Sequence, residues 1–355
     1  MPPIAALLAA MLACGPDSAP TWDDIDFAFI GGGADASDAR WLMGGSSVDQ
    51  TVRRISAERL VTSEAIAWRR GGLAVLAVGP LADGTSPGDD AHVLWSIDEL
   101  GSLPTTRLRA DNAHISVVRT MTPSPSRKTM LVEVATSEPF GVTSIGRHLI
   151  LVDLEAGDPE TSNTDLWPDG SGAAWSADNR TLAATYADVS YDEEWTPEYS
   201  PCEIYLHNTS THEVWYPDND ASADERAPAF SPDGSVLAYV SDANGGNEIL
   251  LWPVAGGPAA SIGAPPCPPD RLTWLPDGER LLVGCGASFA LIDREGRERL
   301  APQPGTARDL ATDGGRLLLE LTVGTEVHVA VFDLEDGSTV DLGLGRAPVW
   351  RLAEP

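Results

Sequence analysis

Acidic and aromatic side chains gather in one stretch of this sequence, ADVSYDEEWTPEYSP at residues 187–201. Aromatic rings supply contact area at a low entropic cost, so rings spaced among acids in an exposed loop suit a protein interface. The alternative is that the rings fold back and hold a long loop in place. We predict a partner-binding surface, whose candidate residues here and in the following stretch DNDASADER are Tyr191, Asp192, Glu193, Glu194, Trp195, Tyr199, Asp218 and Asp220.

Metal binding is a second chemistry that such acids could serve, because Ca²⁺ takes carboxylate oxygens as ligands. DNDASAD lacks the Gly and the terminal Glu of an EF-hand loop, so we expect no cofactor, with Ca²⁺ as the alternative. The six histidines are scattered, and His92, His148 and His328 stand at equivalent places near the start of a strand. That recurrence indicates a repeat position rather than a ligand cluster, and no metal ligand is predicted.

Familiar catalytic motifs are missing from the sequence. It has no G-x-S-x-G, no H-E-x-x-H, no cysteine pair at zinc spacing and no glycine loop that could cradle phosphate. Asp233 and Asp277 each stand in a P-D-G tripeptide within a unit that recurs along the chain, which indicates a turn rather than catalysis. We therefore predict no catalytic residue and a protein that is not an enzyme.

The P-D-G turns introduce the elements that must position these side chains. In FSPDGS, Pro232 presets φ, Asp233 suits the next corner and Gly234 accepts a positive φ, so a hairpin turn is predicted. The following run from Val236 to Val240 shows no polar alternation, which requires burial on both faces. Small antiparallel sheets that are buried on both faces must stack on one another.

The same unit recurs along the chain, which indicates a repeat architecture. Its copies align the residue Phe230 with Trp68, Pro123, Trp175, Trp274 and Leu310. Near the C-terminus APVWRL matches the opening strand of a unit, and near the N-terminus DFAFIGGG, ARWLMGG and TVRRISAER read as three later strands that lack a first. We predict an all-β, seven-bladed β-propeller, with six blades as the alternative, whose ring is closed when the C-terminal strand joins the N-terminal strands.

SPDG followed by a buried strand and then by GGNEIL resembles the repeat of TolB-type β-propellers, which are related to WD40-like propellers. The resemblance covers roughly residues 23–352 and is most specific at 227–254 and 271–296. It implies the propeller fold alone. We expect neither the additional N-terminal domain of TolB nor the hydrolase domain that propellers cap in prolyl-oligopeptidase-type enzymes.

An apolar run near the N-terminus, IAALLAAMLA at residues 4–13, has the length of a signal-peptide core and is too short to span a bilayer. Cys14 follows directly and precedes a polar segment, an order that is similar to a bacterial lipoprotein signal. We expect a signal peptide at 1–13, a tether at 14–22 that is lipidated at Cys14, and the propeller at 23–355. An ordinary signal peptide and an unprocessed N-terminus are the alternatives.

The net charge argues against nucleic-acid partners, and the cysteines bear on the redox state of the compartment. Lys and Arg number 23 against 53 Asp and Glu, a net charge of −30, so nucleic-acid binding is not expected. Cys267 and Cys285 fall on segments that a hairpin brings side by side, so they form either a disulfide or two buried thiols. Cys202 has no obvious partner.

These observations predict a monomeric, non-catalytic lipoprotein of the bacterial cell envelope, exported to the periplasm or the outer membrane. Its propeller face would bind another envelope protein, and the lipid anchor would be its membrane contact. The alternative is a carbohydrate-binding protein, or a metal-dependent lyase or hydrolase, that uses a pocket at the axis of the ring. Such an enzyme would bring His, Arg or carboxylate side chains together at the axis.

Overall fold

The described part of the chain is all-β apart from one short 3₁₀ helix, η2 (Trp22–Asp24). The computed structural model describes residues 22–32, 40–55, 62–69, 72–78, 92–97, 105–110, 115–137, 145–153, 163–168, 172–187, 189–191, 197–217, 222–311 and 313–351. The predicted signal peptide at 1–13, the lipidation site Cys14 and most of the tether at 14–22 lie outside these ranges. No helix in the described ranges is long and apolar enough to cross a membrane.

Five of the sheets in the described ranges have four strands each, joined in antiparallel order. They are β4 (Thr62–Arg69), β5 (Gly72–Val78), β6 (His92–Ile97) and β7 (Thr105–Ala110); β8 (Ile115–Pro123), β9 (Thr129–Ser137), β10 (Ile145–Asp153) and β11 (Asn163–Pro168); β12 (Ala173–Trp175), β13 (Thr181–Tyr186), β16 (Glu203–Asn208) and β17 (Val214–Trp215); β18 (Glu225–Phe230), β19 (Val236–Ser241), β20 (Glu248–Pro253) and β21 (Ala260–Ser261); and β22 (Arg271–Trp274), β23 (Arg280–Gly284), β24 (Ser288–Asp293) and β25 (Glu298–Pro304).

A larger sheet of seven strands joins the two ends of the chain. Its strands, in spatial order, are β26 (Thr306–Leu310), β27 (Arg316–Val323), β28 (Glu326–Asp333), β29 (Thr339–Trp350), β1 (Phe27–Gly32), β2 (Arg40–Ser46) and β3 (Thr51–Arg54). The remaining pair, β14 (Val189–Tyr191) and β15 (Pro197–Tyr199), forms a small separate hairpin.

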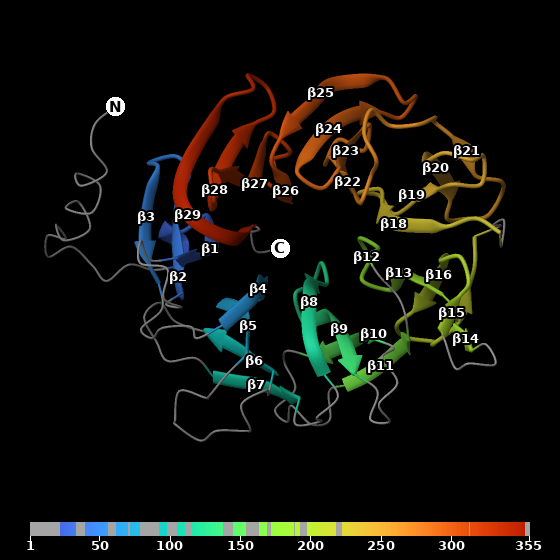
Figure 1. Ribbon diagram of the computed structural model, residues 1–355, viewed down its shortest axis with the longest axis horizontal. Coiled ribbons are helices and arrows are strands. Elements are labelled where there is room, and N and C mark those ends of the chain that lie inside the picture. Colours follow the sequence, from blue (N-terminus) through green and yellow to red (C-terminus); the bar gives the residue numbers. More distant parts are fainter. Residues whose placement is uncertain are drawn as a thin grey trace, which may run out of the picture.

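The sheets stand in a ring, as Figure 1 shows, with the first strand of each repeat nearest the centre. These inner strands are β4, β8, β12, β18, β22, β26 and the second half of β29. Contacts run from one inner strand to the next, for example between β4 and β8, β12 and β18, β18 and β22, and β29 and β4. The prediction of an all-β propeller is confirmed.

β29 closes the ring because its two halves pair with different neighbouring strands. Its first half pairs with β28, from Thr339 opposite Phe332 to Leu344 opposite His328. Its second half pairs with β1, from Gly345 opposite Gly31 to Trp350 opposite Phe27. The C-terminal strand therefore joins the N-terminal strands, as the complementary gaps in the sequence predicted.

Burial on both faces of the sheets follows from the unbroken apolar runs. In β19, Leu237, Ala238, Tyr239 and Val240 are all buried. Ala238 and Val240 pack with residues of β22 and β23, whereas Leu237 and Tyr239 pack with residues of β13 and β16 on the other side. Because successive side chains of a strand point to opposite faces, one strand contributes to the core on both of its sides.

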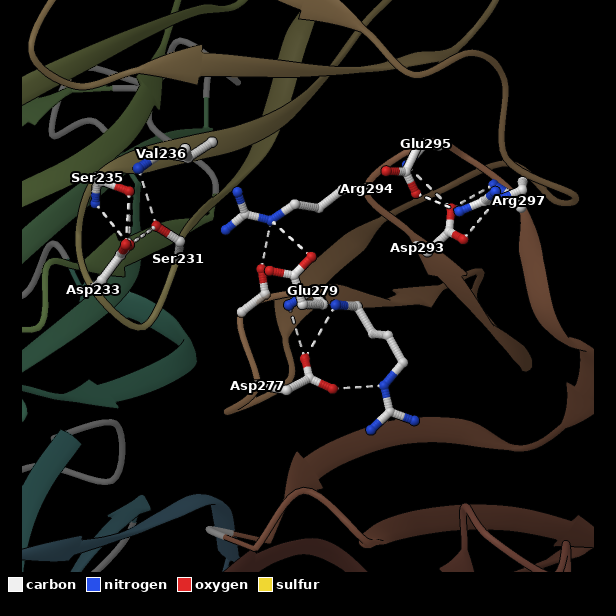
Figure 2. A network of polar contacts seen from close by, with 12 residues as sticks. Ser231, Asp233, Ser235, Val236, Asp277, Glu279, Asp293, Arg294, Glu295 and Arg297 are labelled. Carbon is white, nitrogen blue, oxygen red and sulfur yellow. Dashed lines mark hydrogen bonds and ion pairs between the residues drawn. The ribbon is translucent and has the colours of Figure 1, made fainter.

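The P-D-G turns are held by their own aspartates (Figure 2). Gly234 has a φ of 72°, and its N–H donates to the Ser231 carbonyl at 2.8 Å. Asp233 Oδ1 accepts from Ser231 Oγ at 2.6 Å and from the Ser235 N–H at 3.0 Å. These hydrogen bonds, that from Ser231 first, lower the pKa of Asp233 to about 2. Asp277 likewise accepts from the Glu279 N–H at 2.8 Å, so both aspartates stabilise turns.

Tryptophans at the ends of inner strands bond neighbouring sheets together. The indole Nε1 of Trp274 donates to the Ala229 carbonyl at 3.1 Å, and that of Trp175 donates to the Thr122 carbonyl at 3.3 Å. The indole of Trp68 donates in the same way to Val349 at 3.4 Å. In each case the acceptor carbonyl lies one residue before the end of the preceding inner strand. The same hydrogen bond therefore recurs between these three pairs of neighbouring sheets.

Cys267 and Cys285 form a disulfide, with their Cα atoms 5.9 Å apart. It links the segment before β22 to the residue that follows β23, the pair of segments that the sequence analysis placed side by side. Cys202 lies outside this disulfide and is half-buried.

Candidate functional site at the ring axis

The predicted partner-binding residues fall mainly outside the described chain. Asp192, Glu193, Glu194 and Trp195, with Asp218 and Asp220, belong to the segments that the structure does not describe. Tyr191 ends β14 and Tyr199 ends β15, and the backbones of these two strands pair with Val189 opposite Tyr199. The stretch predicted as one long loop therefore contains a hairpin, inserted between β13 and β16, and its binding role stays a prediction.

The base of this hairpin is tied to an inner strand. The N–H of Cys202 donates to Asp224 Oδ1 at 3.1 Å, and the N–H of Glu225 donates to the Cys202 carbonyl at 2.7 Å. Glu225, the first residue of β18, is buried, and its Oε2 accepts from the Ile204 N–H at 3.4 Å. The hairpin thus rises on the face of the ring where inner strands begin.

Charged side chains from two neighbouring inner strands, β22 and β26, and from the adjacent strand β27 interact with one another. We call Arg271 on β22, Arg308 and Asp309 on β26, and Glu320 on β27 the axial cluster. Arg271 Nη1 donates to the Arg308 carbonyl at 3.1 Å, which connects one sheet to the next. Arg308 Nη2 lies 2.6 Å from Glu320 Oε2, and Glu320 Oε1 accepts from the Ala347 N–H at 2.5 Å.

A β-bulge in β26 creates the position of Arg308. Ala307 pairs with Leu319 and Asp309 pairs with Leu318, so Arg308 between them has no partner across the strands. An extra residue in one strand re-aims the neighbouring side chains. The bulge therefore lets both Arg308 and Asp309 serve the cluster, although they are adjacent in the sequence.

Asp309 connects the cluster to the strand that closes the ring. Its Oδ2 accepts from the Trp350 N–H at 2.7 Å and its Oδ1 accepts from the Leu310 N–H at 3.0 Å. Burial raises the pKa of Asp309 to about 7, although both hydrogen bonds and the charge of Arg271 act in the opposite direction. A carboxyl that titrates near neutral pH is characteristic of functional sites.

Arg271 is enclosed by protein and yet reached by solvent. Burial, followed by the like charge of Arg308, lowers its pKa, while Asp270, Asp309 and Glu320 oppose the shift. Its surface is nonetheless exposed, and within the described ranges no carboxylate forms an ion pair with its guanidinium. A planar guanidinium in this setting can bind an acceptor group through two parallel hydrogen bonds.

The histidines contribute elsewhere. His328 Nδ1 lies 2.9 Å from Asp341 Oδ2, between β28 and β29 rather than on an inner strand. The side chains of His92 and His148 are outside the described residues. Where the chain is described, no group of three or more His, Cys, Asp or Glu residues is arranged to hold a metal ion.

Known proteins similar to this chain include a peptidase and propellers. No protein-family model matches the chain. The uncharacterized peptidase YuxL of Bacillus subtilis (strain 168) is 27% identical over 164 residues, which cover 45% of this chain and 24% of YuxL. The chain thus matches about a quarter of the length of this curated relative.

Two solved structures share the fold at low sequence identity. TolB from Acinetobacter baumannii has a TM-score of 0.52 at 16% identity, covering 92% of this chain and 82% of TolB. A puromycin-hydrolyzing peptidase of Mycobacterium tuberculosis has a TM-score of 0.58 at 15% identity, covering 90% of this chain and 54% of the peptidase. The resemblance to TolB-like propellers is therefore confirmed at the level of fold.

The prediction that the protein is not an enzyme is wrong by these comparisons, since a relative and a structural neighbour are named as peptidases. That prediction rested on missing catalytic motifs, and a motif search is blind to charged groups that a fold assembles from separate strands. An enzyme was expected to bring His, Arg or carboxylate side chains together at the axis, and the axial cluster brings Arg and carboxylate side chains together on two inner strands and the strand beside them. Its signal in the sequence was an arginine within each of two neighbouring inner strands, Arg271 and Arg308.

Proposed function

We propose that this protein takes part in the hydrolysis of peptide-like substrates and that its propeller binds the substrate at the axial cluster. The observation that carries the proposal is the grouping of Arg271, Arg308, Asp309 and Glu320 on the inner strands β22 and β26 and the adjacent β27. The similarity to proteins named as peptidases gives the reaction class.

The physical argument rests on what charged groups cost away from bulk water. Enclosing a guanidinium and a carboxyl is unfavourable unless each is compensated by hydrogen bonds or opposite charge. Asp309 is compensated by two backbone N–H groups, whereas Arg271 has only the Arg308 carbonyl as a hydrogen-bond partner in the described chain. A polar substrate would supply the missing acceptors.

Hydrolysis tests the proposal directly. The full chain would be incubated with puromycin and with aminoacyl and dipeptidyl 4-nitroanilides, and the released amine would be measured. We expect release above the buffer rate, with KM raised about tenfold by Arg271→Gln and kcat little changed. Arg280→Gln is the matched control, because Arg280 pairs with Asp277 at 2.6 Å at the opposite end of β23. A folded protein that releases amine from none of these substrates would contradict the proposal.

A second role is favoured by the hairpin β14–β15. It stands on the same face as the start of β18, and the sequence around it supplies the acids and rings from Tyr191 to Tyr199. We propose that it contacts another envelope protein and that the chain is exported and anchored through lipid at Cys14. In-cell crosslinking would compare native protein with a variant whose residues 188–199 are Gly and Ser, and capture of the same partners by both would contradict this role.

We also propose that the ring has seven blades. Five sheets of four strands are separate, and the seven-stranded sheet divides within β29 into β26–β28 with its first half and β1–β3 with its second half. Five and two give seven units of four strands. Cryo-electron microscopy class averages viewed down the axis would test the number, and six-fold averages would contradict it.

A further inference from the structure

We infer that the axial cluster recognises a carboxylate, as at the C-terminus of a short peptide, through the guanidinium groups of Arg271 and Arg308. The inference rests on the proposed function for the site and goes beyond it by naming the group that is bound. It follows from three observations on the described residues: the placement of the two arginines, the carboxylate that already occupies one of them, and the charge of the rest of the molecule.

The two arginines are held side by side. The hydrogen bond of 3.1 Å from Arg271 Nη1 to the Arg308 carbonyl fixes one guanidinium beside the backbone that carries the other. Like-charge repulsion from Arg308 acts on Arg271, which places their charged groups close together. Two neighbouring guanidinium groups repel each other unless an anion lies between or beside them.

The charges of Asp270, Asp309 and Glu320 act on Arg271, but none of these carboxylates forms an ion pair with its guanidinium in the described ranges. Glu320 pairs with Arg308 Nη2 at 2.6 Å, and its other oxygen accepts from the Ala347 N–H at 2.5 Å, so each oxygen of Glu320 already has a partner. The Glu320 side chain is 13% exposed, whereas that of Arg308 is 37% exposed and faces solvent. Arg271 therefore presents the free donors, and an incoming carboxylate could take two of them in parallel.

The charge of the whole chain argues for selectivity at this point. With 53 acids against 23 basic residues, the surface repels anions in general. A carboxylate ligand would be attracted where a cation has no ion-pair partner, as is the case for Arg271 among the described residues, and bidentate binding adds geometric fit to the charge. We name a peptide as the ligand because the proposed function concerns peptide-like substrates.

Binding of matched peptides tests the inference without any chemistry. Isothermal titration would compare triglycine and trialanine as free acids, the same peptides as C-terminal amides, and inorganic phosphate. We expect the acids to bind about tenfold more tightly than the amides to native protein. Arg271→Gln should remove that difference, Arg271→Lys should restore part of it, and Arg280→Gln should retain it in full.

Several results would overturn the inference. Equal affinity of acid and amide, no binding of either acid, or tighter binding of phosphate than of the acids would each exclude a carboxylate subsite. The comparison of acids with amides uses native protein, so it tests the inference even if a substitution harms folding. The proposed hydrolysis is judged separately from amine release: release with equal binding of acid and amide would preserve the reaction and reject this subsite.

Discussion

At the scale of single residues, Asp309 makes the stability of the fold depend on pH below neutrality. Its pKa is about 7 in the folded chain, against an ordinary value of 3.8 for an aspartate. Between these values the folded state holds a proton that the unfolded state has lost, so the free energy of unfolding falls as pH rises through this window. The turn carboxyl of Asp233 has the opposite effect, because hydrogen bonds lower its pKa to about 2. The free energy of unfolding that it contributes is lost as pH falls toward that value.

We therefore predict that urea titrations at pH 4, 5.5 and 7 show a smaller decline in unfolding free energy for Asp309→Asn than for native protein. The difference between the two declines should be about 3 kcal/mol. Asp336→Asn is a suitable control, because Asp336 lies at an exposed turn and its pKa is lowered by Ser338. Parallel slopes for native protein and Asp309→Asn would show that Asp309 does not hold a proton at neutral pH.

At the scale of elements, the indole hydrogen bonds make each inner strand a partner of the one before it. Replacing Trp274 by Phe keeps an aromatic ring but leaves the Ala229 carbonyl without its donor. We predict a loss of about 1 to 2 kcal/mol in unfolding free energy. Trp350 ends the equivalent strand, but its Nε1 has no hydrogen-bond partner in the described chain, so Trp350→Phe should cost less. If guanidinium titrations gave the same loss for Trp274→Phe and Trp350→Phe, the loss would come from the smaller ring and not from the missing hydrogen bond.

The disulfide makes a second prediction for the elements. The double variant Cys267→Ser, Cys285→Ser should lower the unfolding free energy by about 3 kcal/mol, because the bridge closes a loop of 18 residues. The same loss should follow when native protein is reduced before denaturant titration. Cys202→Ser, tested with and without reductant, serves as control. An unchanged midpoint for the double variant would contradict a stabilising role.

The sequence predicted elements better than it predicted the site, for a physical reason. Turn chemistry at Gly234 and the unbroken run at β19 are local, so the residues themselves determine them. The axial cluster depends on the register between β26 and β27, and the bulge at Arg308 shifts that register by one residue. Because one residue of register exchanges the faces of a strand, side-chain direction could not be derived from spacing alone.

At the scale of the whole molecule, β29 determines whether the ring is closed. Gly345 lies where β29 passes from β28 to β1, and a Cβ there would overlap the Phe29 ring and approach the Ile30 carbonyl at 2.9 Å. We predict that Gly345→Ala lowers the unfolding free energy by about 1 to 3 kcal/mol and speeds hydrogen exchange in β1 and β29. Gly246→Ala is the control, because a Cβ there meets nothing within 4 Å. Unchanged exchange in β1 would contradict the closure by β29.

The central claim is that substrate binds at the axis, and a photoreactive peptide tests it most directly. A tripeptide free acid carrying a benzophenone would be crosslinked to native protein, and the modified residues would be located by mass spectrometry. We predict adducts on β22, β26 and β27, competed by unlabelled tripeptide and lost in Arg271→Gln. Adducts confined to outer strands or to the β14–β15 hairpin, unaffected by that substitution, would contradict the account.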